Sequence, residues 1–271
     1  MYSLKKLSYF LKKSWQPAVP KSLSYPPGAE DTIFLSEGMV LGERVYIGPF
    51  TQITGDVHLG DGVKIIGNCV IDGKNGPVII GAGTVIEPHT LIVGPAVIGE
   101  NSEIRAKCSF RKSDCGSGCK LVGEIEECII GNNLRTRPGC VMFQSTIGND
   151  CEIGAEVRKS HIGDNSKAVH QNSYLGNATV GDGTNFASGS ITLNYDGTPN
   201  KKDTEIGPDC FIGAGNLLVA PLIIGKNVAT AAGVTIRHHV SDDTFVDPEG
   251  KFRPNEMEND GDGHWRRIRK N

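Results

Sequence analysis

A hydrophobic residue recurs at every sixth position along much of this chain of 271 residues. The three longest runs lie at positions 41, 47, 53, 59 and 65, at 80, 86, 92, 98, 104 and 110, and at 206, 212, 218, 224, 230 and 236, where only Thr230 is polar. A period of six fits neither an α-helix nor a sustained heptad. It is typical of a hexapeptide β-helix, in which each short strand points one large side chain inward before the chain turns a corner.

The corners of such a coil need residues that tolerate a positive φ, and the sequence supplies them. The chain contains 35 glycines, and its corners read Gly-Asp-Gly at 60–62 and Gly-Lys-Asn at 225–227. Gly, Asn and Asp adopt positive φ more readily than other residues. We therefore predict an all-β solenoid of parallel strands, each three to five residues long, with roughly eleven coils over 33–240. Residues 1–32 precede this domain and a tail of 241–271 follows it.

The cysteines follow the same frame. Six of the eight fall four places after the first residue of a hexad, at 69, 108, 128, 140, 151 and 210. At that small inward position a cysteine serves as a small apolar residue, so we expect no disulfide framework and a cytoplasmic protein. Cys115 and Cys119 interrupt the frame. No nearby pair of ligands completes a zinc set with them, and we expect no metal.

The N-terminal segment has a different pattern. Its apolar residues at 4, 7, 10 and 11 fall at helical spacing, and its lysines lie mostly around the other side. This pattern predicts a short basic amphipathic helix that caps the domain, with weak contact to an anionic membrane surface as the alternative. The net charge of −3 gives no indication of nucleic-acid binding.

Three stretches lack the hexad pattern. Residues 72–78 are interpreted as a corner loop, residues 111–129 as a longer insertion of undefined role, and residues 194–204 as a polar loop. In a solenoid, insertions project from the faces and often contain the binding surface.

Several phrases around the third stretch are more specific than the hexads. They are SKAVHQNSYLG at 166–176, ITLNYDG at 191–197, the pair NK at 200–201 and VAPLIIG at 219–225. Over about 130–240 the chain resembles the acetyltransferase domain of the bifunctional N-acetylglucosamine-1-phosphate uridyltransferase/glucosamine-1-phosphate acetyltransferase family, within the hexapeptide-repeat acyltransferases. The resemblance implies a left-handed parallel β-helix and a homotrimer with sites between neighbouring chains. No stretch resembles the nucleotidyltransferase half, so we expect no uridyl transfer.

The resemblance also implies roles for single residues. His170 occupies the base position of the family, and an imidazole suits the removal of a proton from an attacking amine. His161 lies at a variable position and is treated as a surface residue. Arg137, Arg158 and Lys201 match the phosphate-binding positions, where Arg grips phosphate in a bidentate manner and Lys acts as a point charge. The family has Lys in place of Arg158.

The remaining matches concern the sugar, the acetyl group and the cofactor. Positions that contact the sugar or the acetyl group are matched by Tyr174, Asn185, Asn194 and Tyr195. The acetyl-CoA track is matched by Ala214 and Ala232. Two spacings depart from the family, since one extra residue lies between His170 and Tyr174 and another between Tyr195 and Lys201.

The resemblance therefore implies an acetyl-CoA-dependent N-acetyltransferase that acts on glucosamine 1-phosphate or a closely related amino-sugar phosphate. The altered spacings leave an alternative open, an acyltransferase for a different sugar or a nucleotide sugar. A second alternative is a catalytically silent trimeric scaffold that has kept the coil and lost the chemistry.

Overall fold

The computed structural model describes residues 23–27, 32–36, 39–254, 257–259 and 265–267. No α-helix occurs within these ranges, and hence no helix that could span a membrane. The N-terminal helix that we predict lies outside them. The chain divides into two compact units, Met1–Cys119 and Lys120–Asn271, which are described separately.

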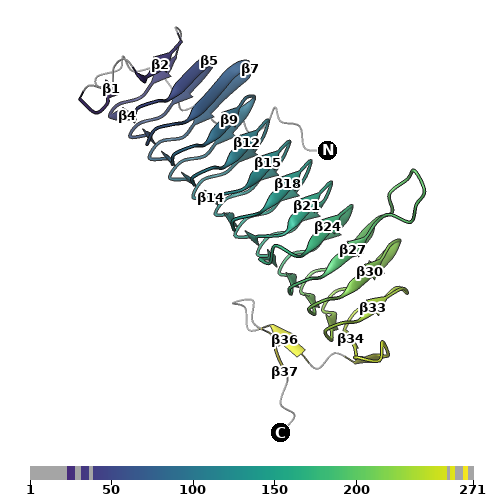
Figure 1. Ribbon diagram of the computed structural model, residues 1–271. Coiled ribbons are helices and arrows are strands. Elements are labelled where there is room, and N and C mark those ends of the chain that lie inside the picture. Colours follow the sequence, from purple (N-terminus) through teal and green to yellow (C-terminus); the bar gives the residue numbers. More distant parts are fainter. Residues whose placement is uncertain (1–22, 28–31, 37–38, 255–256, 260–264, 268–271) are drawn as a thin grey trace. The chain divides into compact units, whose positions relative to one another are not determined.

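The first unit is a parallel β-solenoid whose strands stack coil upon coil (Figure 1). One stack runs through β1, β4, β6, β8 and β11, and a second through β5, β7, β9 and β12. The strands are β1 (Leu23–Ser24), β2 (Phe34–Leu35), β3 (Val40–Leu41), β4 (Val45–Ile47), β5 (Gln52–Leu59), β6 (Lys64–Ile65), β7 (Val70–Ile80), β8 (Val85–Ile86), β9 (Leu91–Val93), β10 (Ala96–Ile98), β11 (Glu103–Ile104), β12 (Ser109–Arg111) and β13 (Asp114–Cys115).

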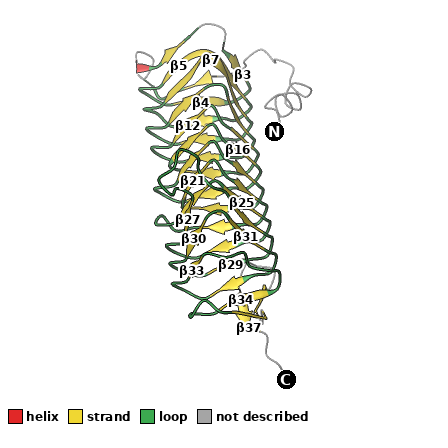
Figure 2. Ribbon diagram, turned by 90° about the vertical axis from the view of Figure 1, so that its right-hand side faces the viewer, coloured by secondary structure: helices red, strands yellow, loops and turns green. Residues whose placement is uncertain are grey.

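The second unit contains the candidate site and has three faces (Figure 2). The first face consists of β14 (Lys120–Leu121), β17 (Arg135–Thr136), β20 (Glu152–Ile153), β23 (Lys167–Ala168), β26 (Asn185–Phe186), β29 (Phe211–Ile212), β32 (Ala229–Thr230) and β34 (Thr244–Val246). The second consists of β15 (Glu124–Glu126), β18 (Val141–Phe143), β21 (Glu156–Arg158), β24 (Tyr174–Gly176), β27 (Ile191–Leu193), β30 (Leu217–Val219) and β33 (Thr235–Ile236).

The third face consists of β16 (Ile129–Ile130), β19 (Thr146–Ile147), β22 (His161–Ile162), β25 (Ala178–Val180), β28 (Thr204–Ile206) and β31 (Leu222–Ile224). All pairings within the three faces are parallel. An antiparallel strand, β35 (Phe252–Pro254), pairs with β34, and β36 (Met257–Asn259) pairs with β37 (Trp265–Arg267).

The six-spaced side chains form the interior of both units, as the period predicts. Ile86, Phe110 and Ile212 are fully buried, and even the polar member, Thr230, is only 2% exposed. Its hydroxyl accepts hydrogen bonds from the Gly213 N–H and from the side-chain amide of Asn216. A buried polar side chain costs little free energy when its hydrogen bonds are satisfied, which explains a threonine at an aliphatic position.

Several details differ from the sequence-based expectations. Most strands have two or three residues, because the corners use most of each hexad, while β5 and β7 are longer. Residues 72–78 are not a corner loop, since they lie inside β7, where Asp72 pairs with Thr54 of β5. The polar loop is confirmed at 194–203, and it projects from the coil after β27 (Figure 1). The left-handed winding remains a prediction.

The stretch 111–129 is not an insertion but forms further strands of the coil. Cys115 pairs in register with the inward-pointing Ile98, and Cys119 follows four places later at the small inward position. The spacing between inward residues is five and not six after Phe110. The two cysteines therefore occupy regular inward positions of the coil. All eight cysteines are buried, and none of them forms a disulfide bond. No three His, Cys, Asp or Glu side chains of the described ranges are grouped to hold a metal ion.

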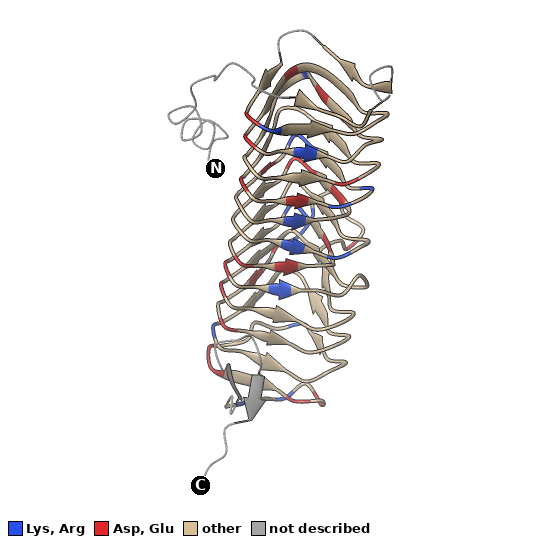
Figure 3. Cartoon of the chain, turned by 90° about the vertical axis from the view of Figure 1, so that its left-hand side faces the viewer, with Lys and Arg blue, Asp and Glu red and all other residues tan. Residues whose placement is uncertain are grey.

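The first face of the second unit contains a row of charged residues, whose positions are coloured blue and red in Figure 3. Arg135 of β17 pairs in register with Glu152 of β20, and Glu152 with Lys167 of β23. Opposite charges on directly paired positions stabilise a sheet by about 0.2–1 kcal/mol per pair. Arg137 lies in the corner that directly follows β17, next to this row.

Candidate active site

The corner between the first and second faces brings Arg137 and His170 to one edge of the second unit. Arg137 follows β17 and His170 follows β23, with Gly154 of the intervening coil between them. A Cβ atom on Gly154 would lie 3.1 Å from the Arg137 Cβ and 2.1 Å from the Val169 carbonyl oxygen. Only a glycine therefore allows the coils to pack this closely here. The Arg137 Nη2 atom donates a hydrogen bond to Glu152 Oε2 at 3.0 Å, while 57% of the side chain stays exposed.

His170 is exposed at this edge. Its backbone carbonyl accepts a hydrogen bond from the Ser173 N–H, which closes the turn. Among the residues that the structure describes, none gives the His170 imidazole a hydrogen bond or an ion pair. Both ring nitrogens are consequently accessible to a substrate.

The two alanines matched to the acetyl-CoA track lie on the same edge. The Gly215 N–H donates to the Ser188 carbonyl at 2.8 Å, and the Gly233 N–H donates to the Ala214 carbonyl at 2.7 Å. Ser188, Ala214 and Ala232 thus occupy, in successive coils, the first turn position of the corner, which in the His170 coil is occupied by the next residue, Gln171. Beyond Gln171, the side chains of this row are all small.

A second cluster surrounds Gly176 at the end of β24. A Cβ atom on Gly176 would lie 2.4 Å from the Tyr174 hydroxyl and 2.6 Å from the Asn194 Nδ2 atom. The phenol and the amide therefore both lie over this glycine. Arg158 pairs with Gly176 in register on the neighbouring strand β21, so the cluster combines a hydroxyl, an amide and a guanidinium. These are the groups that bind the hydroxyls and phosphate of a sugar phosphate.

Asn194 is held in place by a residue that the sequence analysis did not identify. It is only 5% exposed, and its Nδ2 atom donates to the Oδ1 atom of Asn177 at 2.9 Å. The Asn177 N–H in turn donates to the Arg158 carbonyl at 3.0 Å. Asn177 has a positive φ of 51°. In the sequence it resembles any other corner asparagine, and no signal in the sequence distinguishes it.

The guanidinium of Arg158 is positioned by two neighbours. Its Nε atom donates to the Glu156 carboxylate, which raises the pKa of the arginine further, and its Cζ atom lies 5.9 Å from the centre of the Phe143 ring. The side chain remains 44% exposed. It stays charged and can still contact an anion.

The loop at 194–203 places the last two predicted residues together. Tyr195 is 61% exposed, and Lys201 Nζ lies 4.6 Å from the centre of its ring. An exposed cation–π contact contributes about 0.5–1 kcal/mol. The Lys202 N–H donates to the Asn194 carbonyl at 2.9 Å and closes the base of the loop.

Two of the predicted site residues, Asn185 and His170, lie outside the Gly176 cluster. Asn185 projects from β26 on the first face, in register with Lys167 and Phe211, and is not part of the Gly176 cluster. His170 precedes β24 while the Gly176 cluster lies at its end, so the strand separates the His170 imidazole from this cluster.

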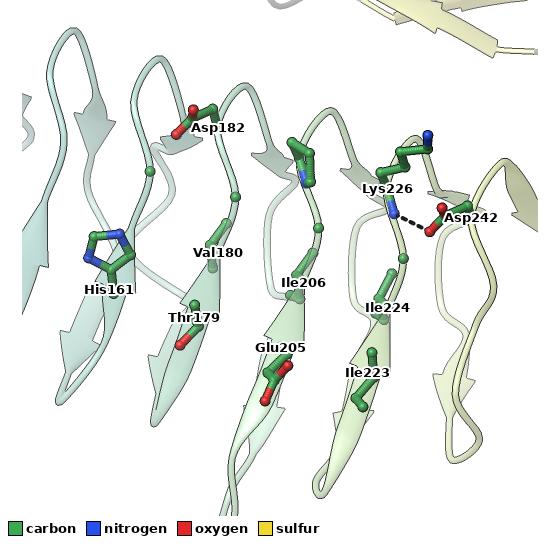
Figure 4. Close-up of a pocket in the computed structure, with 15 residues that line it drawn as sticks. His161, Thr179, Val180, Asp182, Glu205, Ile206, Ile223, Ile224, Lys226 and Asp242 are labelled. Carbon is green, nitrogen blue, oxygen red and sulfur yellow. Dashed lines mark hydrogen bonds between the residues drawn. The ribbon is translucent and has the colours of Figure 1, made fainter.

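A shallow groove of about 560 Å³ lies on the third face, apart from every predicted site residue (Figure 4). His161, Thr179, Glu205 and Ile223 project in a row along its floor (Figure 4). The structure thus places His161 on a different face from His170, in agreement with its treatment as a surface residue.

The chain is similar in sequence to known proteins. The model of the bacterial transferase hexapeptide family (six repeats) matches residues 38–73. The bifunctional protein GlmU of Bifidobacterium longum subsp. infantis is 39% identical over 213 residues, which are 79% of this chain and 34% of that protein. GlmU of Acaryochloris marina is 38% identical over 217 residues, 80% of this chain and 39% of that protein. This chain is a hexapeptide-repeat homologue of GlmU.

The chain spans little more than a third of the length of these GlmU relatives. Among solved structures, an Arabidopsis UDP-N-acetylglucosamine acyltransferase covers 83% of this chain, with 73% of its own chain aligned. The two are 12% identical with a TM-score of 0.39, a likeness too small to support a conclusion.

Proposed function

We propose that this chain is an acyltransferase that uses acetyl-CoA to N-acetylate glucosamine 1-phosphate or a closely related amino-sugar phosphate. The main observation in its support is the exposed His170 imidazole, which immediately precedes the corner row that continues through Ser188, Ala214 and Ala232. The homology with GlmU over most of the chain supports the same reaction class.

The reaction assigns two proton transfers to His170. The neutral amine of the sugar attacks the thioester carbonyl of acetyl-CoA, and His170 takes the proton that the nitrogen loses. The tetrahedral intermediate then collapses, the carbon–sulfur bond breaks, and the proton on His170 passes to the leaving thiolate. A base with a pKa near neutrality suits both transfers, and typically contributes about 10²–10⁴ in rate.

The other residues hold the acceptor. Arg137, Arg158 and Lys201 bind the phosphate, since each presents an exposed cation. Tyr174, Asn194 and Tyr195 contact the sugar and the acetyl group that is transferred to it, and Asn185 contributes from the first face.

Since β24 separates His170 from the Gly176 cluster, we further propose a homotrimer. In it, the edge of one chain lies against the second face of its neighbour, and each site combines residues of two chains. Closed cyclic assemblies of this kind are common among homo-oligomers.

A different sugar is the second candidate, and the altered corners favour it. Residues 154–155 form an unusually short corner and residues 169–173 an unusually long one, both beside His170. A side chain moved by ~3 Å, the length of one residue, alters which acceptor fits.

A thiol-release assay with acetyl-CoA separates the candidates. It compares glucosamine 1-phosphate, glucosamine 6-phosphate and UDP-glucosamine as acceptors. Turnover with glucosamine 1-phosphate alone supports the proposal, and turnover with UDP-glucosamine alone supports the second candidate. A chain that releases no thiol with any amino sugar is a silent scaffold.

A further inference from the structure

The corner that presents His170 is tied to the coils on both sides of it by the two residues that follow. The side-chain amide of Gln171 donates a hydrogen bond to the Pro138 carbonyl oxygen, which lies two coils away. The Asn172 Oδ1 atom accepts a hydrogen bond from the Ser188 hydroxyl of the next coil at 3.0 Å.

The reach of Gln171 across two coils depends on the lengths of three successive corners. Residues 137–140 form the first corner, residues 154–155 the second and residues 169–173 the third. Because the second corner has only residues 154–155, none of its side chains lies between Pro138 and the longer third corner. Gln171 fills the gap that results.

The packing of Gln171 shows that the gap is filled closely. A Cβ atom on Gly139 would lie 3.0 Å from both the Cδ and the Nε2 atoms of Gln171. Gly139 also has a positive φ of 83°, a conformation that favours glycine. The Gln171 amide thus lies against the backbone of Gly139, where no side chain could displace it.

We infer that Gln171 and Asn172 form a clamp that positions His170 for proton transfer. The inference rests on the proposed role of His170 as the base. His170 itself has no side-chain partner among the described residues, so the position of its ring depends on the backbone of residues 169–173. Gln171 fixes that backbone to the coil of Pro138, two coils earlier, and Asn172 fixes it to the next coil. Both are positioning residues, since neither needs to touch the substrate.

The clamp predicts a specific kinetic change. Catalysis by a base requires the reacting atoms at near-contact geometry, and a displacement of about 1 Å can cost roughly 100-fold in rate. Gln171→Ala should therefore lower kcat roughly 10- to 100-fold and leave the KM for acetyl-CoA unchanged. Gln171→Glu should behave in the same way, because a carboxylate faces the Pro138 carbonyl without a proton to donate.

Gln144 offers a matched control. Its Nε2 atom donates to Glu127 Oε2 at 2.7 Å, which is also an exposed bond between coils but belongs to a different corner. Gln144→Ala should leave kcat unchanged. Thermal unfolding of all variants shows whether the coil is intact.

A second measurement does not depend on turnover. In protein labelled with ¹⁵N-histidine, the His170 imidazole signals are identified by their loss in His170→Ala. These signals should shift or broaden in Gln171→Ala and stay in place in Gln144→Ala. If they stay in place in Gln171→Ala and its kcat equals that of the wild type, the clamp is refuted. If the wild type acetylates no amino sugar, the proposed function fails, and the His170 signals alone decide whether the clamp exists.

Discussion

The side-chain amide of Asn194 is oriented by Asn177, whose Oδ1 atom accepts a hydrogen bond from Asn194 Nδ2 at 2.9 Å. Because Asn194 is almost fully buried, this bond determines which atom of its amide faces the Tyr174 hydroxyl above Gly176. The Asn177 backbone also bonds to the strand of Arg158. One corner residue thus links the amide, the phenol and the guanidinium that we assign to the acceptor.

Substitutions at Asn177 test this link. Asn177→Ala should raise the KM for the sugar phosphate about tenfold, because Asn194 loses the acceptor that orients it, at a cost near that of one hydrogen bond. Asn177→Asp retains an acceptor oxygen and should remain close to the wild type. Steady-state kinetics measure both, and equal KM values for the two variants would show that the bond has no role.

His170→Ala should lower turnover by about 10²-fold or more and leave the affinity for acetyl-CoA nearly unchanged. A base acts in the transition state and contributes little to binding the cofactor in the ground state. His161→Ala is the internal control, since His161 lies on the third face. If both variants kept near-wild-type turnover on the true acceptor, the base would have to be another group.

Lys201→Ala should act mainly on binding. Its charge meets the phosphate before and during the reaction, so the KM for the sugar phosphate should rise roughly 10- to 100-fold, the range for one charge-assisted hydrogen bond, with a smaller change in kcat. Lys202→Ala removes the adjacent lysine, whose backbone closes the loop, and should bind the substrate normally. An unchanged KM in Lys201→Ala would remove this residue from the site.

The assembly is open to a direct test. We expect light scattering to give the mass of three chains at micromolar concentration, because His170 and the Gly176 cluster lie at opposite ends of β24. Mixing His170→Ala chains with Asn194→Ala chains, after unfolding and refolding together, should restore part of the activity, since some mixed sites contain neither substitution. A stable monomer with full activity would contradict the shared site.

Much of the fold follows from the sequence because inward side chains recur with the strands. Ile86, Ile92 and Ile98 are six apart, and each of them is completely buried. The period fails where a corner changes length. The next inward residue after Phe110 is Cys115, five positions later. If a spacing of six is continued beyond Phe110, this regular part of the coil is mistaken for an insertion.

The site was less accessible to sequence reasoning for the same reason. His170 and the loop residues Tyr195 and Lys201 could be proposed from motifs, because each motif contains its own spacing. The contact of Gln171 with Pro138 could not be predicted from the sequence. The two residues are distant in sequence, and they meet only because the corner of the coil between them is short. The length of each corner determines which side chains of different coils are in contact, and these lengths become known only from the structure.

The final prediction concerns a buried carboxyl outside the site. Asp114 is only 7% exposed, and burial raises its pKa from 3.8 to about 6, although a hydrogen bond from the Val97 backbone opposes the shift. The folded chain therefore holds this proton more tightly than the unfolded chain. Hence the free energy of unfolding of the wild type should fall as the pH rises from about 4 to 6. Above pH 6 the full loss of stability from the ionised, buried carboxylate should remain.

Asp114→Asn replaces this carboxyl with a neutral group of the same shape. It should raise the free energy of unfolding by about 1–2 kcal/mol at pH 8, since each unit of pKa shift corresponds to about 1.4 kcal/mol and solvent relaxation reduces the effect. The gain should shrink towards zero near pH 4, where the wild-type carboxyl is protonated in both states. Urea denaturation at the two pH values measures the difference. Asp150→Asn, at an exposed corner, is the control and should show no comparable gain at pH 8. A stability gain that is equal at pH 4 and pH 8 would mean that the substitution acts through packing and not through the charge of Asp114.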